Sequence, residues 1–170
     1  FDEEMPQVHQ ASQDVKDLLA TSYPGLPTYG IVCGDIIGDI NKKPSYFSPM
    51  IDAISETKIP FFYVIGNHDL DLNFGPTYYS FNRGNVHYVI LDDIFFLAKS
   101  YLYAGYLTEQ QLQWLEQDLK QVTPGSTVVV AIHIPTYSRE ARNKEWGKES
   151  TMKVMNNRSS LYELLKPYNT

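Results

Sequence analysis

Cysteine is nearly absent from this sequence, because Cys33 is the single cysteine in 170 residues. One thiol excludes an internal disulfide and says little about the cellular compartment. Cys33 lies within an apolar run, and free cysteines are usually buried as small apolar residues. We therefore predict that Cys33 belongs to the core and has no metal or redox role.

Long hydrophobic segments are also missing. No apolar stretch approaches the roughly 20 residues that a membrane-spanning helix requires. No signal peptide is visible either, and a shortened N-terminus would have removed one. The sequence therefore predicts no membrane span and leaves the compartment open.

Basic residues are in the minority, with 14 Lys and Arg against 20 Asp and Glu and a formal net charge of −6. This balance gives no footprint for nucleic acid or for an anionic membrane surface. It also disfavours an anionic substrate unless metal ions supply positive charge. The length and a hydrophobic content of 43% suffice for one core, and we predict a single domain over residues 1–170.

The sequence does contain short apolar runs that end at polar residues. Runs at 29–33, 61–65 and 127–132 are typical of buried strands in an α/β sheet. In such sheets, ligands bind beyond the carboxyl ends of the strands. The candidate site residues directly follow these three runs: Asp35, Asn67, His68 and His133. We expect them to meet at one rim.

Other segments follow familiar patterns. Apolar spacing predicts helices over 8–20, 46–56, 109–121 and 159–166. Thr108, with Gln111 three residues later, indicates a capping box at the start of the third helix. Residues 82–85 indicate a turn between two strands, and the polar segment 137–157 is predicted to be a loop or insertion on the site side of the sheet.

The candidate residues suit a metal centre. An aspartate can bridge two cations, a histidine nitrogen suits Zn, Mn or Fe, and an asparagine adds a neutral oxygen. Two metals roughly 3.5–4 Å apart activate a water and clamp the oxygens of a phosphoryl centre. A histidine that stays off the metals can protonate the leaving group. The pattern therefore predicts a metal-dependent phosphoesterase.

The motifs GDIIGD at 34–39 and GNHD at 66–69, followed by the lone His133, resemble the calcineurin-like metallophosphoesterase superfamily. Its blocks are D-x-H, G-D-x-x-(D/G), G-N-H-(D/E), a lone histidine and G-H-x-H, and the middle three occur here in order. Segments 78–92 and 107–115 resemble its hairpin and its following helix. The resemblance implies an α/β fold, a β-sandwich of two mixed sheets flanked by helices.

The resemblance also implies roles and cofactors. Asp35 matches the carboxylate that bridges two divalent ions, which would be Mn, Fe or Zn. Asn67 and His133 match ligands of the second ion, and His68 matches the catalytic histidine that meets the leaving group of the phosphoester substrate.

The support of the catalytic histidine is left open. Many relatives place an acid three residues after the bridging aspartate, but Gly38 stands there in this chain. The resemblance therefore leaves either Asp39 or Asp69 to support His68.

Two of the family's blocks are absent. No D-x-H precedes Asp35 and no G-H-x-H follows His133. We therefore hypothesise that the chain is a piece of a longer enzyme, cut at both ends. This piece would hold at most one metal ion weakly and would be weakly active or inactive. Strand edges exposed by the cut would favour a homodimer.

Each candidate has a structural alternative. Asp35 suits a strand-end turn and Asn67 a helix cap, whereas His68 and His133 could be structural histidines. The corresponding alternative function is a non-catalytic binding domain with a degenerate metal site. His87 is interpreted as a structural strand residue. The tyrosines within 78–79 and 101–106 are interpreted as packing groups, not as a substrate platform.

Overall fold

The computed structural model describes residues 5–26, 28–36, 47–69, 75–97, 102–138 and 152–170, and all structural statements below concern these residues. The helices are α1 (Met5–Thr21), α2 (Phe47–Ser55), α3 (Glu109–Leu119) and α5 (Arg158–Leu165). The strands are β1 (Gly30–Val32), β2 (Phe61–Tyr63), β3 (Tyr79–Arg83), β4 (Val86–Ile90), β5 (Ile94–Phe96), β6 (Tyr103–Gly105) and β7 (Thr127–Ala131). The predicted helices and the predicted strands are therefore confirmed to within a few residues.

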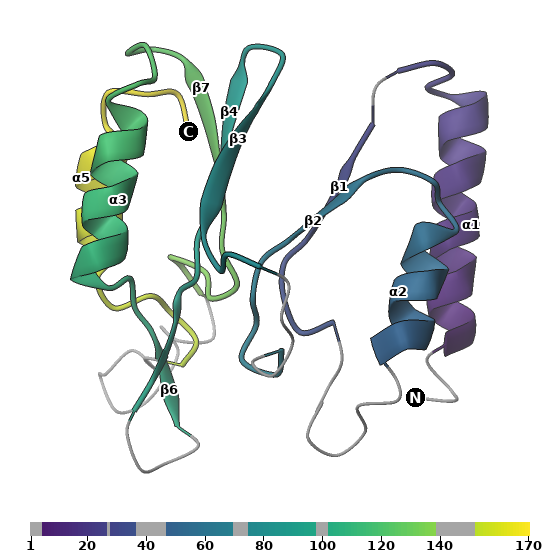
Figure 1. Cartoon of the computed structure of the whole chain (residues 1–170), viewed down its shortest axis with the longest axis horizontal. Coiled ribbons are helices and arrows are strands. Elements are labelled where there is room, and N and C mark those ends of the chain that lie inside the picture. The colour runs from purple at the N-terminus through teal and green to yellow at the C-terminus, as the bar shows by residue number, and fades with distance from the viewer. Residues whose placement is uncertain (1–4, 27, 37–46, 70–74, 98–101, 139–151) are drawn as a thin grey trace.

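The strands form two central sheets (Figure 1). Strands β1 and β2 pair in parallel, while β4 pairs antiparallel with β3 and parallel with β7. Helices α1 and α2 cover the outer side of the first sheet, and α3 and α5 cover the outer side of the second. The predicted sandwich of sheets flanked by helices is confirmed.

Aromatic rings join the inner faces of the two sheets. Phe62 stacks on Phe81 with ring centroids 3.8 Å apart, and Phe81 stacks on Tyr88 at 5.1 Å. Beside them, Val64 and Ile90 are almost completely buried. These contacts hold the carboxyl ends of the strands from both sheets at the same edge of the molecule.

A second core lies beneath α3 and α5. Leu107, Leu115 and Met155 are fully buried there. Met155 belongs to the segment 137–157, which the sequence predicts to be a polar loop; residues 139–151 of that segment lie outside the described residues. The end of the segment differs from this prediction. Val154 and Met155 are an apolar pair that packs into the core, and the Met155 N–H donates to the Pro135 carbonyl at 3.0 Å.

Strands β5 and β6 form a third, antiparallel two-stranded sheet that the sequence does not predict. Each strand has only three residues, too few for alternation to be recognised. Of the aromatic residues on this hairpin, Tyr106 is 38% exposed and Phe95 is 42% exposed. Tyr106 pairs with Phe95 and Tyr103 pairs with Phe96, with ring centroids 5.6 Å and 6.2 Å apart. The rings therefore pack within the hairpin, as predicted from the sequence, and remain partly exposed.

Helix α3 begins at the predicted cap. The Thr108 hydroxyl accepts a hydrogen bond from the Gln111 N–H at 3.2 Å. The Gln111 amide does not return to the cap. It accepts from the Asp92 N–H at 2.9 Å and donates to the Asp92 carbonyl at 2.7 Å. Half of the capping box is therefore formed, and the other half is exchanged for a bond that fixes α3 to the end of β4.

None of the described helices combines the length and the apolar character needed to cross a membrane.

Loss of the Thr108 cap should destabilise the chain measurably. In Thr108→Ala the Gln111 N–H loses its acceptor, and we expect the free energy of unfolding in urea to fall by about 1 kcal/mol. Thr108→Ser retains a hydroxyl and should stay close to the original value. Equal stabilities for the alanine and serine variants would contradict this role of the cap.

Candidate metal centre

The loops after β1, β2 and β7 bring three of the candidate side chains together. His133 Nε2 lies 3.2 Å from Asn67 Oδ1 and 3.5 Å from Asp35 Oδ2. Asp35 follows β1, Asn67 follows β2 and His133 follows β7, so both sheets contribute. The rim expected from the strand ends is the place where these three residues meet.

The His133 ring is held in one tautomer. Its Nδ1 lies 2.8 Å from the carbonyl oxygen of Cys33, and a carbonyl oxygen only accepts hydrogen bonds. The proton of the neutral ring therefore sits on Nδ1, and the lone pair sits on Nε2. A metal-binding histidine commonly has its other ring nitrogen fixed in this way.

The atoms that meet at this point are suited to a cation. Nε2 of His133 faces two oxygens, from Asp35 and Asn67. Ligands of one ion at bond lengths of about 2.0–2.2 Å stand roughly 3–3.5 Å apart, which matches the spacing here. In the described part of the chain, no group of three or more His, Cys, Asp or Glu gathers in a metal-binding arrangement. The third donor here is an asparagine.

The loop that carries Asp35 is tightly constrained. Gly34 has φ of +86°, and Asp35 itself has φ of +52°, a region that aspartate tolerates better than most residues. A Cβ on Gly34 would lie 2.5 Å from His133 Nδ1 and 2.8 Å from the Gly66 Cα. A Cβ on Gly66 would collide with the backbone and carboxylate of Asp35. The glycines that end the two apolar runs are therefore required by close packing between the loops.

Asp69 anchors this loop through its carboxylate. Oδ2 accepts from the N–H groups of Asp35 at 2.7 Å and Gly66 at 3.0 Å, and Oδ1 accepts from Ile36 at 3.0 Å. Asp69 is fully buried. Burial raises the pKa of its carboxyl above the ordinary 3.8, while the three backbone donors oppose the rise. Of the two residues that the sequence left as supports of His68, Asp39 lies outside the described residues, and Asp69 binds the backbone around Asp35.

Asp93 has the same function on the other side of the site, and the sequence analysis did not identify it. Its carboxylate accepts from the His133 N–H at 3.1 Å and from the Ile134 N–H at 2.9 Å. The residue is fully buried, and burial raises the pKa of this carboxyl to about 6. Its position after the apolar strand β4 was the available signal, since it parallels the position of Asp35 after β1.

His68, the proposed catalytic histidine, lies beside the carboxylate of Asp35. The backbone N–H of His68 donates to Asp35 Oδ1 at 3.1 Å, and His68 is exposed to solvent. Asp35 therefore uses one oxygen for the backbone of His68 and directs the other toward His133.

Cys33 contradicts its prediction. The structure places it on the surface, not in the core. The reason is that β1 ends at Val32, one residue earlier than the apolar run, so Cys33 lies in the loop at the rim. Its carbonyl oxygen, which fixes the His133 ring, is the part of the residue that the site uses.

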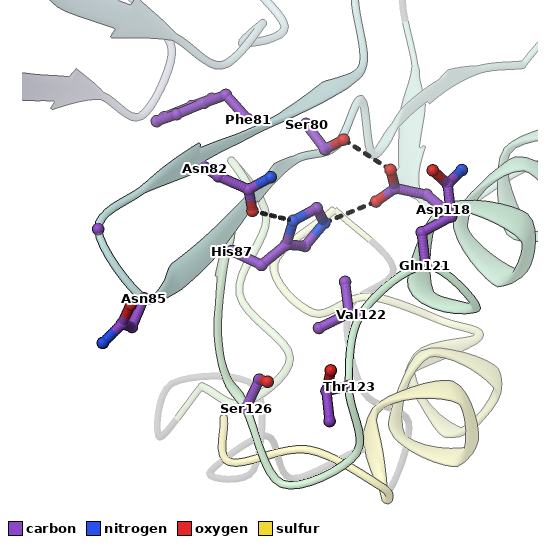
Figure 2. Close-up of a pocket in the computed structure, with 11 residues that line it drawn as sticks. Ser80, Phe81, Asn82, Asn85, His87, Asp118, Gln121, Val122, Thr123 and Ser126 are labelled. Atoms are coloured by element: carbon purple, nitrogen blue, oxygen red, sulfur yellow. Dashed lines mark hydrogen bonds and ion pairs between the residues drawn. The ribbon is translucent and has the colours of Figure 1, made fainter.

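His87 lies at the opposite end of the second sheet, near the start of β4. Figure 2 shows its ring between Asn82 and Asp118, with Nδ1 2.9 Å from Asn82 Oδ1 and Nε2 2.8 Å from Asp118 Oδ2. Asp118 also accepts from the Ser80 hydroxyl at 2.7 Å. These residues line a polar pocket of about 400 Å³. The contacts tie the β3–β4 hairpin to α3, in agreement with the structural interpretation of His87.

Comparison with known proteins identifies the family. The family model for calcineurin-like phosphoesterases matches residues 8–167. The chain belongs to this family.

Relatives agree with this assignment. A 3′,5′-cyclic-nucleotide phosphodiesterase of Nostoc sp. is 25% identical over 146 residues, which are 81% of this chain and 50% of the relative. The chain thus spans half the length of that curated relative. A solved dimetal phosphatase from Danio rerio superposes with a TM-score of 0.68 at 14% identity, covering 96% of this chain and 68% of that structure. The latter likeness concerns the fold. The family and the fold together support a metal-dependent phosphoesterase.

Replacing Gly34 with alanine should be more damaging than the strain of its positive φ alone would make it, because the new methyl group also meets neighbouring atoms. In Gly34→Ala the new methyl group meets His133 and the Gly66 backbone. We expect a loss of about 2–4 kcal/mol in unfolding free energy together with weaker Mn²⁺ binding. Gly125 is the matched control, because it has a similar φ of +84° and open space around its Cα.

Gly125→Ala should therefore cost only about 1 kcal/mol and leave Mn²⁺ binding unchanged. Urea unfolding and titration calorimetry measure the two quantities. Indistinguishable effects of the two substitutions would contradict the steric argument.

Asp93 should make the stability of the metal-free chain depend on pH. Its carboxyl ionises near pH 6 when folded but near its ordinary 3.8 when unfolded. Between these values the folded state holds the extra proton, so the unfolding free energy falls as the pH rises through this window and is level above it. The change attributable to Asp93 is at most about 3 kcal/mol.

The asparagine side chain in Asp93→Asn has no titratable group. The unfolding free energy of this variant, measured in urea at several pH values, should therefore lack the part of the fall that Asp93 causes. The exposed Asp14→Asn is the control and should retain the original slope. An unaltered slope in Asp93→Asn would show that the carboxyl of Asp93 does not carry the pH dependence.

Proposed function

We propose that this chain carries part of a dinuclear metal centre that hydrolyses a phosphomonoester or phosphodiester. The observation that supports this most directly is the meeting of His133 Nε2 with oxygens of Asp35 and Asn67 at 3.2–3.5 Å. The His133 proton is committed to the Cys33 carbonyl, so the Nε2 lone pair is available to a cation. Divalent ions held there would supply positive charge and an activated water.

The residues of the chain have distinct roles in this proposal. Asn67, His133 and Asp35 would hold one ion, and the carboxylate of Asp35 would also serve a second. Asp69 and Asp93 are positioning residues, because their carboxylates fix the backbone of Asp35 and His133. His68 is exposed beside Asp35 and donates a proton to the leaving-group oxygen.

We further propose that this chain alone holds only one ion and holds it weakly. The three donors found among the described residues leave an ion incompletely coordinated, and the sequence contains neither a D-x-H before Asp35 nor a G-H-x-H after His133. The ligands of a complete dinuclear site would come from a longer protein. Mn, Fe and Zn all suit the donor set of nitrogen and oxygen atoms.

Cyclic nucleotides are the first substrates to test. The Nostoc relative carries the name of a 3′,5′-cyclic-nucleotide phosphodiesterase, and a phosphodiester of this kind suits the proposed chemistry. The alternative function, a binding domain with a degenerate metal site, predicts no turnover even when the ligand set is completed.

Metal titration of two proteins tests the proposal. Binding of Mn²⁺ is measured by calorimetry on two proteins. One is this chain, and the other is a longer version that extends it at both ends. We expect one weak site in the chain, lost in His133→Ala, and two tight sites in the extended protein. Equal, tight binding of two ions by both would contradict the partial site, and absence of binding from both would favour the degenerate domain.

Turnover of bis(4-nitrophenyl) phosphate by the extended protein then tests His68. His68→Ala should lower kcat about 10²–10⁴-fold while the ions stay bound. His9→Ala removes another exposed histidine, which lies on α1 and contacts Glu56 at 3.5 Å, and should leave kcat unchanged. An unaltered kcat in His68→Ala would exclude this histidine as the general acid.

A further inference from the structure

The β5–β6 hairpin is attached directly to the candidate metal centre. Asp93, whose carboxylate holds the backbone of His133, immediately precedes β5. The carbonyl of Asp93 also accepts from the Tyr106 N–H at 2.9 Å, at the end of β6. One residue therefore fixes both the base of the hairpin and the loop that carries a candidate metal ligand.

One face of the hairpin is turned toward that loop. A Cβ on Gly105 would lie 2.7 Å from the Ile134 side chain, so the Gly105 side of β6 lies against the residue that follows His133. Tyr103 is two residues earlier in the strand and shares this face. Its partner across the hairpin is Phe96, with ring centroids 6.2 Å apart.

The other face of the hairpin carries a second ring pair. Phe95 and Tyr106 lie there with ring centroids 5.6 Å apart. Strand alternation thus separates the aromatic residues into a pair on the face that contacts the Ile134 side chain and a pair on the opposite face. The two pairs provide an internal comparison, since both are partly exposed.

Electrostatics agree with this placement of Tyr103. Burial, and after it the charge of Asp35, raises the pKa of the Tyr103 phenol above its ordinary 10.0. The phenol therefore lies within electrostatic range of the carboxylate at the centre of the site and remains a protonated donor at neutral pH. Phe96 beside it is 36% exposed, so this ring pair is open to solvent.

We propose that Tyr103 and Phe96 form the wall of the metal centre that receives a flat aromatic ring of the phosphoester, as in an aryl ester or a nucleotide. The inference rests on the proposed function and specifies its substrate class. Two rings on the hairpin face that contacts Ile134 would offer such a group the offset or edge contacts that aromatic groups prefer. An alkyl phosphoester would leave them without a partner, so the two residues determine specificity.

A pair of non-hydrolysable ligands tests the inference without turnover. Phenylphosphonate and methylphosphonate differ by a phenyl ring against a methyl group, and calorimetry on the extended protein in saturating Mn²⁺ compares their dissociation constants. We expect phenylphosphonate to bind about fivefold more tightly. In Tyr103→Ala this ratio should fall to near one, with the methylphosphonate constant unchanged. Tyr103→Phe retains the ring and should keep the ratio.

Tyr106→Ala is the matched control, because it removes a tyrosine from the opposite face of the same hairpin. It should keep the original ratio. Circular dichroism checks that each variant folds. If Tyr103→Ala does not fold, Phe96→Leu replaces it in the test and should lower the ratio in the same way.

The failures are distinguishable. Metal-dependent binding of both phosphonates with the same ratio in all variants would overturn the aromatic wall and leave the proposed function intact. Absence of metal-dependent binding of either phosphonate would overturn the proposed function for this chain, and the inference with it.

Discussion

The hydrogen bond from His133 Nδ1–H to the Cys33 carbonyl, 2.8 Å long, joins the two halves of the molecule at the point where chemistry is expected. His133 follows β7 in the second sheet, and Cys33 follows β1 in the first. The bond requires the two sheets to end at the same level. It also leaves the Nε2 lone pair directed toward Asp35 and Asn67. The alignment of the sheets and the direction of Nε2 are thus linked through one contact.

Two buried carboxylates make that contact possible. Asp69 binds the backbone around Asp35, and Asp93 binds the backbone of His133. A buried carboxyl is costly unless donors surround it, and here backbone N–H groups that would otherwise be unpaired are its partners. Each acid thereby converts a loop into a rigid support. The candidate ligands themselves are not buried, because Asp35 is exposed and Asn67 and His133 are half-buried.

The same support extends to the β5–β6 hairpin. Asp93 fixes His133 and the base of the β5–β6 hairpin, so a ring on the Gly105 face of that hairpin is tied through this residue to the loop of a candidate metal ligand. The His87–Asp118 pair has a comparable structural role far from the site, between the β3–β4 hairpin and α3. Polar contacts with buried partners therefore fix the relative positions of elements whose apolar contacts alone are less directional.

Local signals in the sequence determined the regular elements and the candidate ligands. Apolar runs ending at Gly34 and Gly66, and the cap at Thr108, depend on neighbouring residues and are visible without a fold. The motifs around Asp35, Asn67 and His133 were visible for the same reason, and they led to the family that comparison with known proteins identified.

Tertiary structure alone decided the rest. Asp69 and Asp93 act through bonds to backbone groups of other loops, up to 41 residues away along the chain. Met155 is buried because α3 and α5 enclose it, and Cys33 is exposed because its strand ends one residue early. The orientation of Tyr103 depends on the register of two three-residue strands. Such contacts have no periodicity along the sequence, so only the folded chain reveals them.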